Sequence, residues 1–144
     1  MKIKGLIVFG LGLLMMSCGD KLKEVPMDKF VGVWELKGRE MFDGIQIKIE
    51  NQGGKLTGKI YKLNENKLVK MFAENGQTWV SEITRSSNYQ FRLTEKKLAK
   101  DLFSIYGLST SQEFKIEFID DNTIGLGTDN SDPQSATIIY KRVE

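Results

Sequence analysis

The side chains that most often perform catalysis or hold a metal ion are scarce in this chain. Its 144 residues include no histidine and a single cysteine, Cys18. Histidine is the commonest general base near neutral pH and the commonest transition-metal ligand in proteins. We therefore predict no catalytic residue, no metal site and no cofactor, and we expect that the protein is not an enzyme.

Carboxylates are the remaining candidates for acid–base chemistry. They occur close together as Asp120 with Asp121, as Glu113 with Glu117, and as Asp43 near Glu40. Two carboxylates divide into an acid and a base only where a shared apolar cleft separates their pKa values. Carboxylates in turns or on opposite faces of a strand are usually solvated, so a hydrolase that uses them is the weakest of three hypotheses about function.

An oxygen-rich segment, Thr-Asp-Asn-Ser-Asp-Pro at residues 128–133, offers several ligands to a cation such as Ca²⁺. It lacks the spacing of an EF-hand, and nothing near it in the sequence supplies the remaining oxygens. Asp and Asn before proline more often form a turn. We predict a turn here.

Aromatic side chains are the stronger signal for binding. Candidates for lining a ligand pocket are Tyr61, Trp79, Tyr89, Phe91 and Tyr140. A small barrel either fills with such side chains or leaves a cavity lined by them, so core packing is the alternative interpretation. If a pocket exists, Arg92 or Arg142 could meet the carboxylate of a ligand.

Strands must position these residues, because apolar side chains recur at every second position through most of the chain. The clearest example is Ile45, Ile47 and Ile49, which alternate with polar residues. We predict about nine strands, either from this alternation or from apolar runs that are bounded by turn residues. They lie at residues 30–36, 45–50, 56–60, 68–73, 79–83, 89–94, 114–119, 123–127 and 136–143. Antiparallel strands that turn every 8–12 residues indicate a small up-and-down barrel or a sandwich.

One stretch has the spacing of a helix instead. Between residues 95 and 106 the apolar positions fall within a single arc at about 100° per residue. Thr94 could cap its N-terminus, and Gly107 could take the left-handed position at its C-terminus. We predict one short helix over residues 95–106, with two short strands as the alternative.

The first predicted strand carries a pattern that resembles a known superfamily. Its Phe-Val-Gly-Val-Trp sequence at residues 30–34 is similar to the Gly-x-Trp first strand of lipocalins, fatty-acid-binding proteins and other calycins. This resemblance implies that Gly32 and Trp34 close one end of a barrel and that a basic residue of the last strand packs across the indole. Arg142 is the matching residue here. The second motif of the longer lipocalins, of the Thr-Asp-Tyr type, is not visible.

The N-terminus has the features of an export signal. Lys2 and Lys4 precede an uncharged apolar run that is too short to span a membrane as a helix. The run ends at Met-Met-Ser-Cys-Gly, residues 15–19, which resembles a bacterial lipobox with Met where Leu is usual. We predict a signal peptide at residues 1–17, acylated Cys18 within a tether at 18–28, and one lipocalin-like barrel domain at 29–144. A secreted protein with a free thiol is the alternative.

Removal of this leader leaves no net charge. Lys plus Arg falls from 21 to 19 when Lys2 and Lys4 are lost, which equals the 19 Asp plus Glu. A neutral domain offers no electrostatic basis for binding nucleic acid. Because Gly19, and not Asp, follows Cys18, we expect the lipid anchor to lie in the outer membrane of the cell envelope.

Two hypotheses about function remain ahead of the hydrolase. In the first, the anchored barrel binds a small apolar or amphipathic molecule. In the second, a solid-cored domain binds another envelope protein, as an inhibitor, immunity or assembly factor would. Met41 and Phe42, in a predicted loop, would suit either a lid over a barrel mouth or an exposed contact for a protein.

Overall fold

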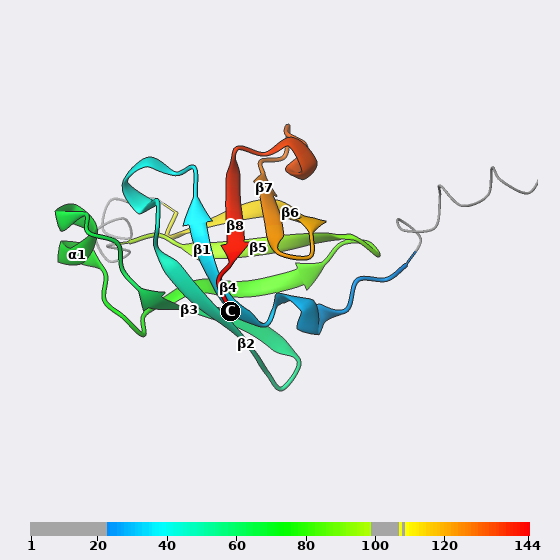
Figure 1. The fold of residues 1–144 in the computed structure, drawn as a ribbon, viewed down its shortest axis with the longest axis horizontal. Helices are drawn as coiled ribbons and strands as arrows, with labels where there is room; N and C mark the ends of the chain where they lie inside the picture. Colours follow the sequence, from blue (N-terminus) through cyan, green and yellow to red (C-terminus); the bar gives the residue numbers. More distant parts are fainter. Residues whose placement is uncertain (1–22, 99–106, 108) are drawn as a thin grey trace, which may run out of the picture.

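Eight antiparallel strands form a closed barrel in the computed structural model, which describes residues 23–98, 107 and 109–144 (Figure 1). The strands are β1 (Gly32–Lys37), β2 (Gln46–Gln52), β3 (Lys55–Lys62), β4 (Thr78–Arg85), β5 (Gln90–Lys96), β6 (Ser111–Asp120), β7 (Thr123–Gly127) and β8 (Ile138–Arg142). Each strand pairs with the next along the chain, and β8 pairs with β1 to close the ring. The predicted fold class, a mainly β up-and-down barrel with one short helix, is confirmed.

The alternating apolar residues point into the barrel, because successive side chains of a strand face opposite sides. All eight strands contribute buried side chains to one continuous hydrophobic cluster. Its packing is close at Gly58 on β3, where an added Cβ would lie 3.0 Å from Cβ of Val80 and 3.4 Å from Cγ1 of Ile49. Side chains therefore fill the barrel around this glycine.

The described helix is not where the sequence pattern placed one. Residues 68–73 were expected to be a strand, but residues 68–72 belong to the helix α1 (Lys67–Phe72) and Ala73 follows it. The side chain of Asn66 caps this helix by accepting hydrogen bonds from the backbone N–H groups of Leu68 and Val69. Only Val69 and Ala73 of this run are buried, and their spacing of four residues is that of a helix face. The barrel consequently has eight strands and not nine.

The stretch predicted as a helix begins in a strand. Glu95 and Lys96 belong to β5, where they continue the alternation of Phe91 and Leu93. Thr94, the expected cap, is also part of β5, while Gly107 does have a positive φ of 68°. The predicted positions 99–106 lie outside the described residues.

The two ends of the barrel differ in their connections. Tight turns at residues 53–54 and 121–122 lie at the end where β1 begins, which we call the closed end. Longer connections, including the loop from Gly38 to Ile45 and the segment with α1, lie at the other end, which we call the mouth. In Figure 1, α1 is at the left and the N-terminal segment is at the right.

Trp34 lies buried at the closed end. Its indole Nε1–H donates to the carbonyl oxygen of Phe30 at 2.8 Å, and the guanidinium carbon of Arg142 is 4.2 Å from the centroid of its ring. Arg142 pairs with Trp34 across the β1–β8 ladder and donates to the carbonyls of Val31 and Lys29 at 3.0 and 2.7 Å. Hydrogen bonds and a cation–π contact therefore link the first strand, the last strand and the turn before β1.

Gly32 is required by the close approach of the C-terminus. Its φ is +141°, and a Cβ there would lie 2.6 Å from the carbonyl oxygen of Glu144 and 2.8 Å from Nη1 of Arg142. A larger residue would separate these chain segments. Gly32, Trp34 and Arg142 thus form one packed unit.

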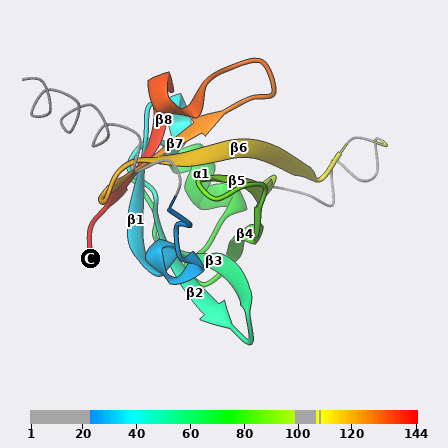
Figure 2. The ribbon, with the colours of Figure 1, turned by 90° about the vertical axis from the view of Figure 1, so that its right-hand side faces the viewer.

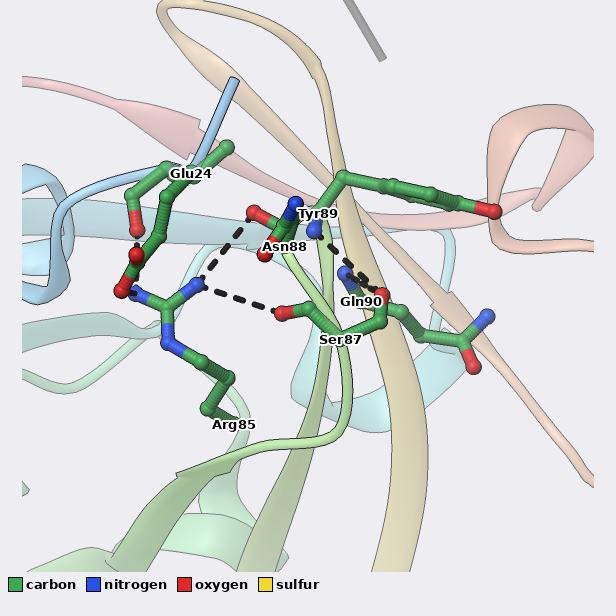
Figure 3. Close-up of polar contacts among 7 residues, drawn as sticks. Glu24, Arg85, Ser87, Asn88, Tyr89 and Gln90 are labelled. Carbon is green, nitrogen blue, oxygen red and sulfur yellow. Dashed lines mark hydrogen bonds and ion pairs between the residues drawn. The ribbon is translucent and has the colours of Figure 1, made fainter. Parts of the chain in front are cut away.

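The N-terminal segment is fastened to the closed end through Arg85. Figure 3 shows the Arg85 guanidinium between Glu24 and the carbonyl oxygens of Ser87 and Asn88, to each of which its Nη1 donates at 3.2 Å. Its Nη2 donates to the carbonyl of Val25 and lies 3.5 Å from a carboxylate oxygen of Glu24. The chain therefore enters the barrel at a defined point, beside the turn between β4 and β5.

This attachment changes the expected boundary of the tether at residues 18–28. Val25 and Met27 are partly buried against the core cluster, and the 3₁₀ turn η1 (Met27–Phe30) leads directly into β1. Figure 2, viewed from the right of Figure 1, shows this blue turn close to the start of β1. The last residues of the expected tether therefore belong to the folded domain.

Candidate functional site

A loop covers part of the mouth. It runs from Gly38 to Ile45 through the 3₁₀ turn η2 (Glu40–Phe42). Gly38 and Gly44 have φ values of +84° and +87°, which suit glycine, and the side chain of Asn64 holds the loop by donating to the carbonyls of Met41 and Asp43, both at 2.8 Å. The loop is therefore anchored to the segment that precedes α1.

Phe42 is one of the side chains of this loop that reach the interior. Its ring lies 5.6 Å from the ring of Trp79, centroid to centroid, in an edge-to-face arrangement. Met41, its neighbour, remains exposed. Of the two apolar residues that the sequence placed in a loop, only Phe42 acts as a cover over the mouth.

A carboxylate is buried beneath this loop. Glu95 continues the inward-facing positions of β5, and only 2% of it is exposed. Its Oε1 accepts hydrogen bonds from the Tyr140 hydroxyl and, at 3.2 Å, from Trp79 Nε1, which also lies 2.9 Å from the Tyr140 hydroxyl oxygen. The charge is compatible with burial because polar donors surround it.

Arg39 completes the coordination of Glu95. Its Nη1 donates to Oε2 of the carboxylate at 2.5 Å. The guanidinium carbon lies 5.1 Å from the ring centroid of Phe42, 5.9 Å from that of Trp79 and 5.5 Å from that of Phe114. Three aromatic rings and a buried carboxylate thus surround one cation, an arrangement favourable to positive charge. We call the four residues around Arg39 the cation cage; they are Phe42, Trp79, Phe114 and Glu95.

Tyr140 is held in its protonated form. Burial and the neighbouring charge of Glu95 keep the pKa of this phenol well above its usual range. The hydroxyl therefore donates to the carboxylate throughout the neutral pH range. This donor helps to fix the orientation of Glu95.

A cleft of about 250 Å³ opens beside this network. Its lining consists of Arg39, Phe42, Trp79, Glu95, Lys96, Lys97, Leu98 and Gln112. Phe42, Trp79 and Leu98 provide apolar contact, whereas Arg39 and Glu95 provide charge. The cleft has the chemical character to hold a small molecule with an apolar part and a polar head.

The residues proposed from the sequence to bind a ligand divide into two groups. Trp79, Phe91 and Tyr140 are buried, and Trp79 lines the cleft. Tyr61 and Tyr89, in contrast, are 48% and 40% exposed. Tyr61 follows the inward-facing Ile60 on β3 and so faces outward, while Tyr89 lies in the turn before β5.

Neither arginine considered as a ligand partner lines the cleft. Arg142 packs on Trp34 at the closed end. Arg92, an exposed residue of β5, lies 3.8 Å from carboxylate oxygens of Glu113 and Asp129. The arginine at the mouth is instead Arg39, which sequence reasoning missed.

Glu95 was also missed, although a signal was present. Phe91, Leu93 and Glu95 share one face if the strand continues past Thr94, so the alternation itself predicts an inward carboxylate. For Arg39 no comparable signal exists. It lies in a loop, and only the folded chain brings it to a partner 56 residues away.

Several of the acidic residues considered for chemistry have structural contacts. Asp121 lies 2.9 Å from Nζ of Lys29. In the oxygen-rich segment, Asp132 accepts a hydrogen bond from the backbone of Gln134 and caps the 3₁₀ turn η3 (Pro133–Ser135). Within residues 23–98, 107 and 109–144, no three residues of the His, Cys, Asp and Glu types come together as a metal site.

The same described ranges contain no helix of sufficient length and apolar character to cross a membrane. Comparisons of the chain with protein-family models, with curated proteins and with solved structures found no match. The geometry of the mouth is therefore the basis for the proposals that follow.

Proposed function

We propose that this protein is a lipocalin-like lipoprotein of the bacterial cell envelope, anchored through acylated Cys18, that binds a small amphipathic molecule at the mouth of its barrel. The cleft beside Phe42 and Trp79 is the observation that carries the proposal. The proposal includes no catalytic step and no nucleic acid as partner. The outer membrane is the proposed location of the anchor.

The size of the cleft limits the ligand. Its volume of about 250 Å³ is just below the roughly 300–1,000 Å³ of usual ligand pockets. The core cluster occupies the barrel below it, so the ligand would lie under the loop and not deep among the strands. A short alkyl or single-ring compound fits this space better than a long-chain lipid.

The attachment point of the N-terminal segment supports an orientation. The backbone N–H of Val25 donates a hydrogen bond to the carbonyl of Asn88 at the closed end, whereas the cleft lies at the mouth. A lipid on Cys18 would therefore connect to the end of the barrel opposite the cleft. In the proposed arrangement, the mouth faces away from the anchoring membrane and is accessible to a dissolved ligand.

Phe42→Ala is expected to weaken retention of the ligand at least tenfold, because it removes one apolar wall of the cleft and the ring that packs on Trp79. The measurement is native mass spectrometry of the lipid-anchored protein extracted from its own membranes. Met71→Ala, which truncates an apolar side chain that is 71% exposed and outside the lining, is the matched control. An empty wild-type protein, or equal loss in both variants, would contradict binding in the cleft.

Cys18→Ser is expected to move the protein from the membrane fraction to the soluble fraction without changing its folded spectrum. Several acyl chains at about 0.8 kcal/mol per buried methylene would otherwise hold it firmly on a bilayer. Fractionation of cells that express the wild-type protein or the variant measures the partition. Unchanged membrane association of the variant would refute the anchor.

Binding to an envelope protein is the second candidate function, and α1 is the observation that favours it. Leu68, Met71 and Phe72 are 53%, 71% and 50% exposed on this short helix. Exposed apolar side chains that gather on one element are typical of protein contacts. If this candidate is correct, Met71→Ala would impair the cellular activity and Phe42→Ala would not.

A further inference from the structure

We infer that the cation cage is an exchangeable binding site, at present occupied by the chain's own Arg39, and that the ligand of the mouth carries an organic cation such as an alkylguanidinium or alkylammonium group. This inference rests on the proposed function, because it assigns the chemical class of the ligand in that same cleft. Four observations carry it.

The first observation is that the buried carboxylate of Glu95 is stabilised by a positive charge in contact with it. Its carboxylate is almost completely buried, and a buried carboxylate needs a cation or several donors in contact. Tyr140 and Trp79 both donate to one oxygen, Oε1. The other oxygen, Oε2, receives Nη1 of Arg39, so this position is where a second cation would bind.

The second observation is the aromatic surroundings of that position. Phe42, Trp79 and Phe114 come from the mouth loop, β4 and β6 and present rings within 6 Å of the guanidinium carbon. Aromatic faces attract ammonium and guanidinium groups through their quadrupole, most strongly when water is excluded. An anionic or neutral head group would gain nothing comparable from the rings and would be repelled by, or indifferent to, Glu95.

The third observation is that Arg39 borders the cleft. The side chain of Arg39 is 20% exposed, and the cleft of about 250 Å³ is lined by this residue together with Phe42, Trp79 and Glu95. A molecule in the cleft with a cationic head is therefore in contact with the cage. Its apolar part would lie beside Leu98.

The fourth observation is the backbone of the loop that delivers Arg39. Glu40, the next residue, has a φ of +20°, which is uncommon for a residue other than glycine. Such conformations persist where surrounding contacts impose them. The contact of Arg39 with Glu95 is one of those that hold the loop, beside the hydrogen bonds of Asn64 and the packing of Phe42 on Trp79, so a cation that replaces Arg39 would remove one of them.

Lys96 and Lys97 also line the cleft and favour the opposite class of ligand. They lie at the end of β5 and directly beyond it. The lysines would attract an anionic head group, whereas the cation cage would attract a cationic one. The relative strength of these two interactions determines which class of ligand binds. It can be measured with compounds of the same size that differ only in the head group.

The test uses butylguanidinium, pentanoate and pentanol, each titrated into the isotopically labelled mature protein. The indole N–H resonance of Trp79 reports binding, and that of Trp34, buried at the closed end, is the internal reference. In Arg39→Ala, butylguanidinium should bind at least tenfold more tightly than in the wild type and at least tenfold more tightly than the other two compounds. Arg39→Ala with Glu95→Gln should lose this preference, and Arg92→Ala, on the outer face of β5, should leave every affinity as in the wild type.

The outcomes separate the two proposals. If pentanoate or pentanol shifts the Trp79 resonance of Arg39→Ala more strongly than butylguanidinium does, the cation inference is wrong and the proposed function stands. If none of the compounds shifts it in either the wild type or the variant, both are wrong. If Arg39→Ala does not fold alone, recovery of its folded spectrum in butylguanidinium and not in pentanoate supports the inference, and the absence of this recovery overturns it.

Discussion

Replacement of Trp34 by alanine is expected to lower the free energy of unfolding by about 3–5 kcal/mol. The side chain is fully buried at the closed end and packs beside Phe118, so its removal leaves a large cavity there. The carbonyl of Phe30 also loses the indole N–H donor, and the guanidinium of Arg142 loses the ring beneath it. These losses affect one packed unit, so they should act together.

Denaturant unfolding followed by far-UV circular dichroism measures this change. Trp34→Phe keeps a ring under Arg142 and should cost clearly less than the alanine variant. Tyr61→Ala, which removes another strand aromatic but an exposed one, is the matched control and should change the stability by less than about 1 kcal/mol. A loss below about 1 kcal/mol for Trp34→Ala would show that this indole does not close the barrel.

Replacement of Glu95 by alanine is expected to destabilise the protein by a similar amount, about 3–5 kcal/mol. The reason is electrostatic and not the loss of volume. Arg39 would remain among three aromatic rings without a counter-ion, and the Tyr140 hydroxyl and the Trp79 N–H would lose their shared acceptor. Removing one member of a buried ion pair costs more than the pair itself contributes.

Glu95→Gln separates charge from hydrogen bonding. The amide keeps an oxygen that can accept hydrogen bonds from Tyr140 and Trp79 but offers no charge to Arg39. The free energy of unfolding of Glu95→Gln should therefore lie between that of the wild type and that of the alanine variant. Glu113→Ala is the control, because Glu113 is an exposed strand glutamate that also lies near an arginine. Exposed pairs contribute roughly 0–1 kcal/mol, and an equal loss in Glu95→Ala and Glu113→Ala would contradict the buried network.

The barrel was predictable because its signal is local and repeated. Alternation in β2 and β3, together with turn residues between strands, specifies which face of each strand is apolar, and antiparallel strands with short connections have few ways to close. The errors occurred where a short apolar run had no clear period. Five of the six side chains of residues 68–73 are apolar, yet only Val69 and Ala73 are buried, at the spacing of a helix and not of a strand.

Because the predicted helix begins at Glu95, this residue was not predicted to be an inward-facing carboxylate of a strand. The helical spacing of the apolar residues up to position 106 predicted a helix that begins at Glu95. A lone carboxylate inside a barrel is costly. The cost is offset by three donors, and all three come from other parts of the chain. Sequence patterns near Glu95 contain no information about them.

The sequence by itself determined the strand alternation, the turn positions and the pairing of a glycine and a tryptophan at the start of the barrel, since each depends on neighbours within a few residues. Only the tertiary structure decided that Arg39, Trp79, Glu95 and Tyr140 meet at the mouth and that Tyr61 and Tyr89 face outward. The physical reason is that strand register and loop path set which side chains share a space. Both result from closure of the whole ring and not from any one segment.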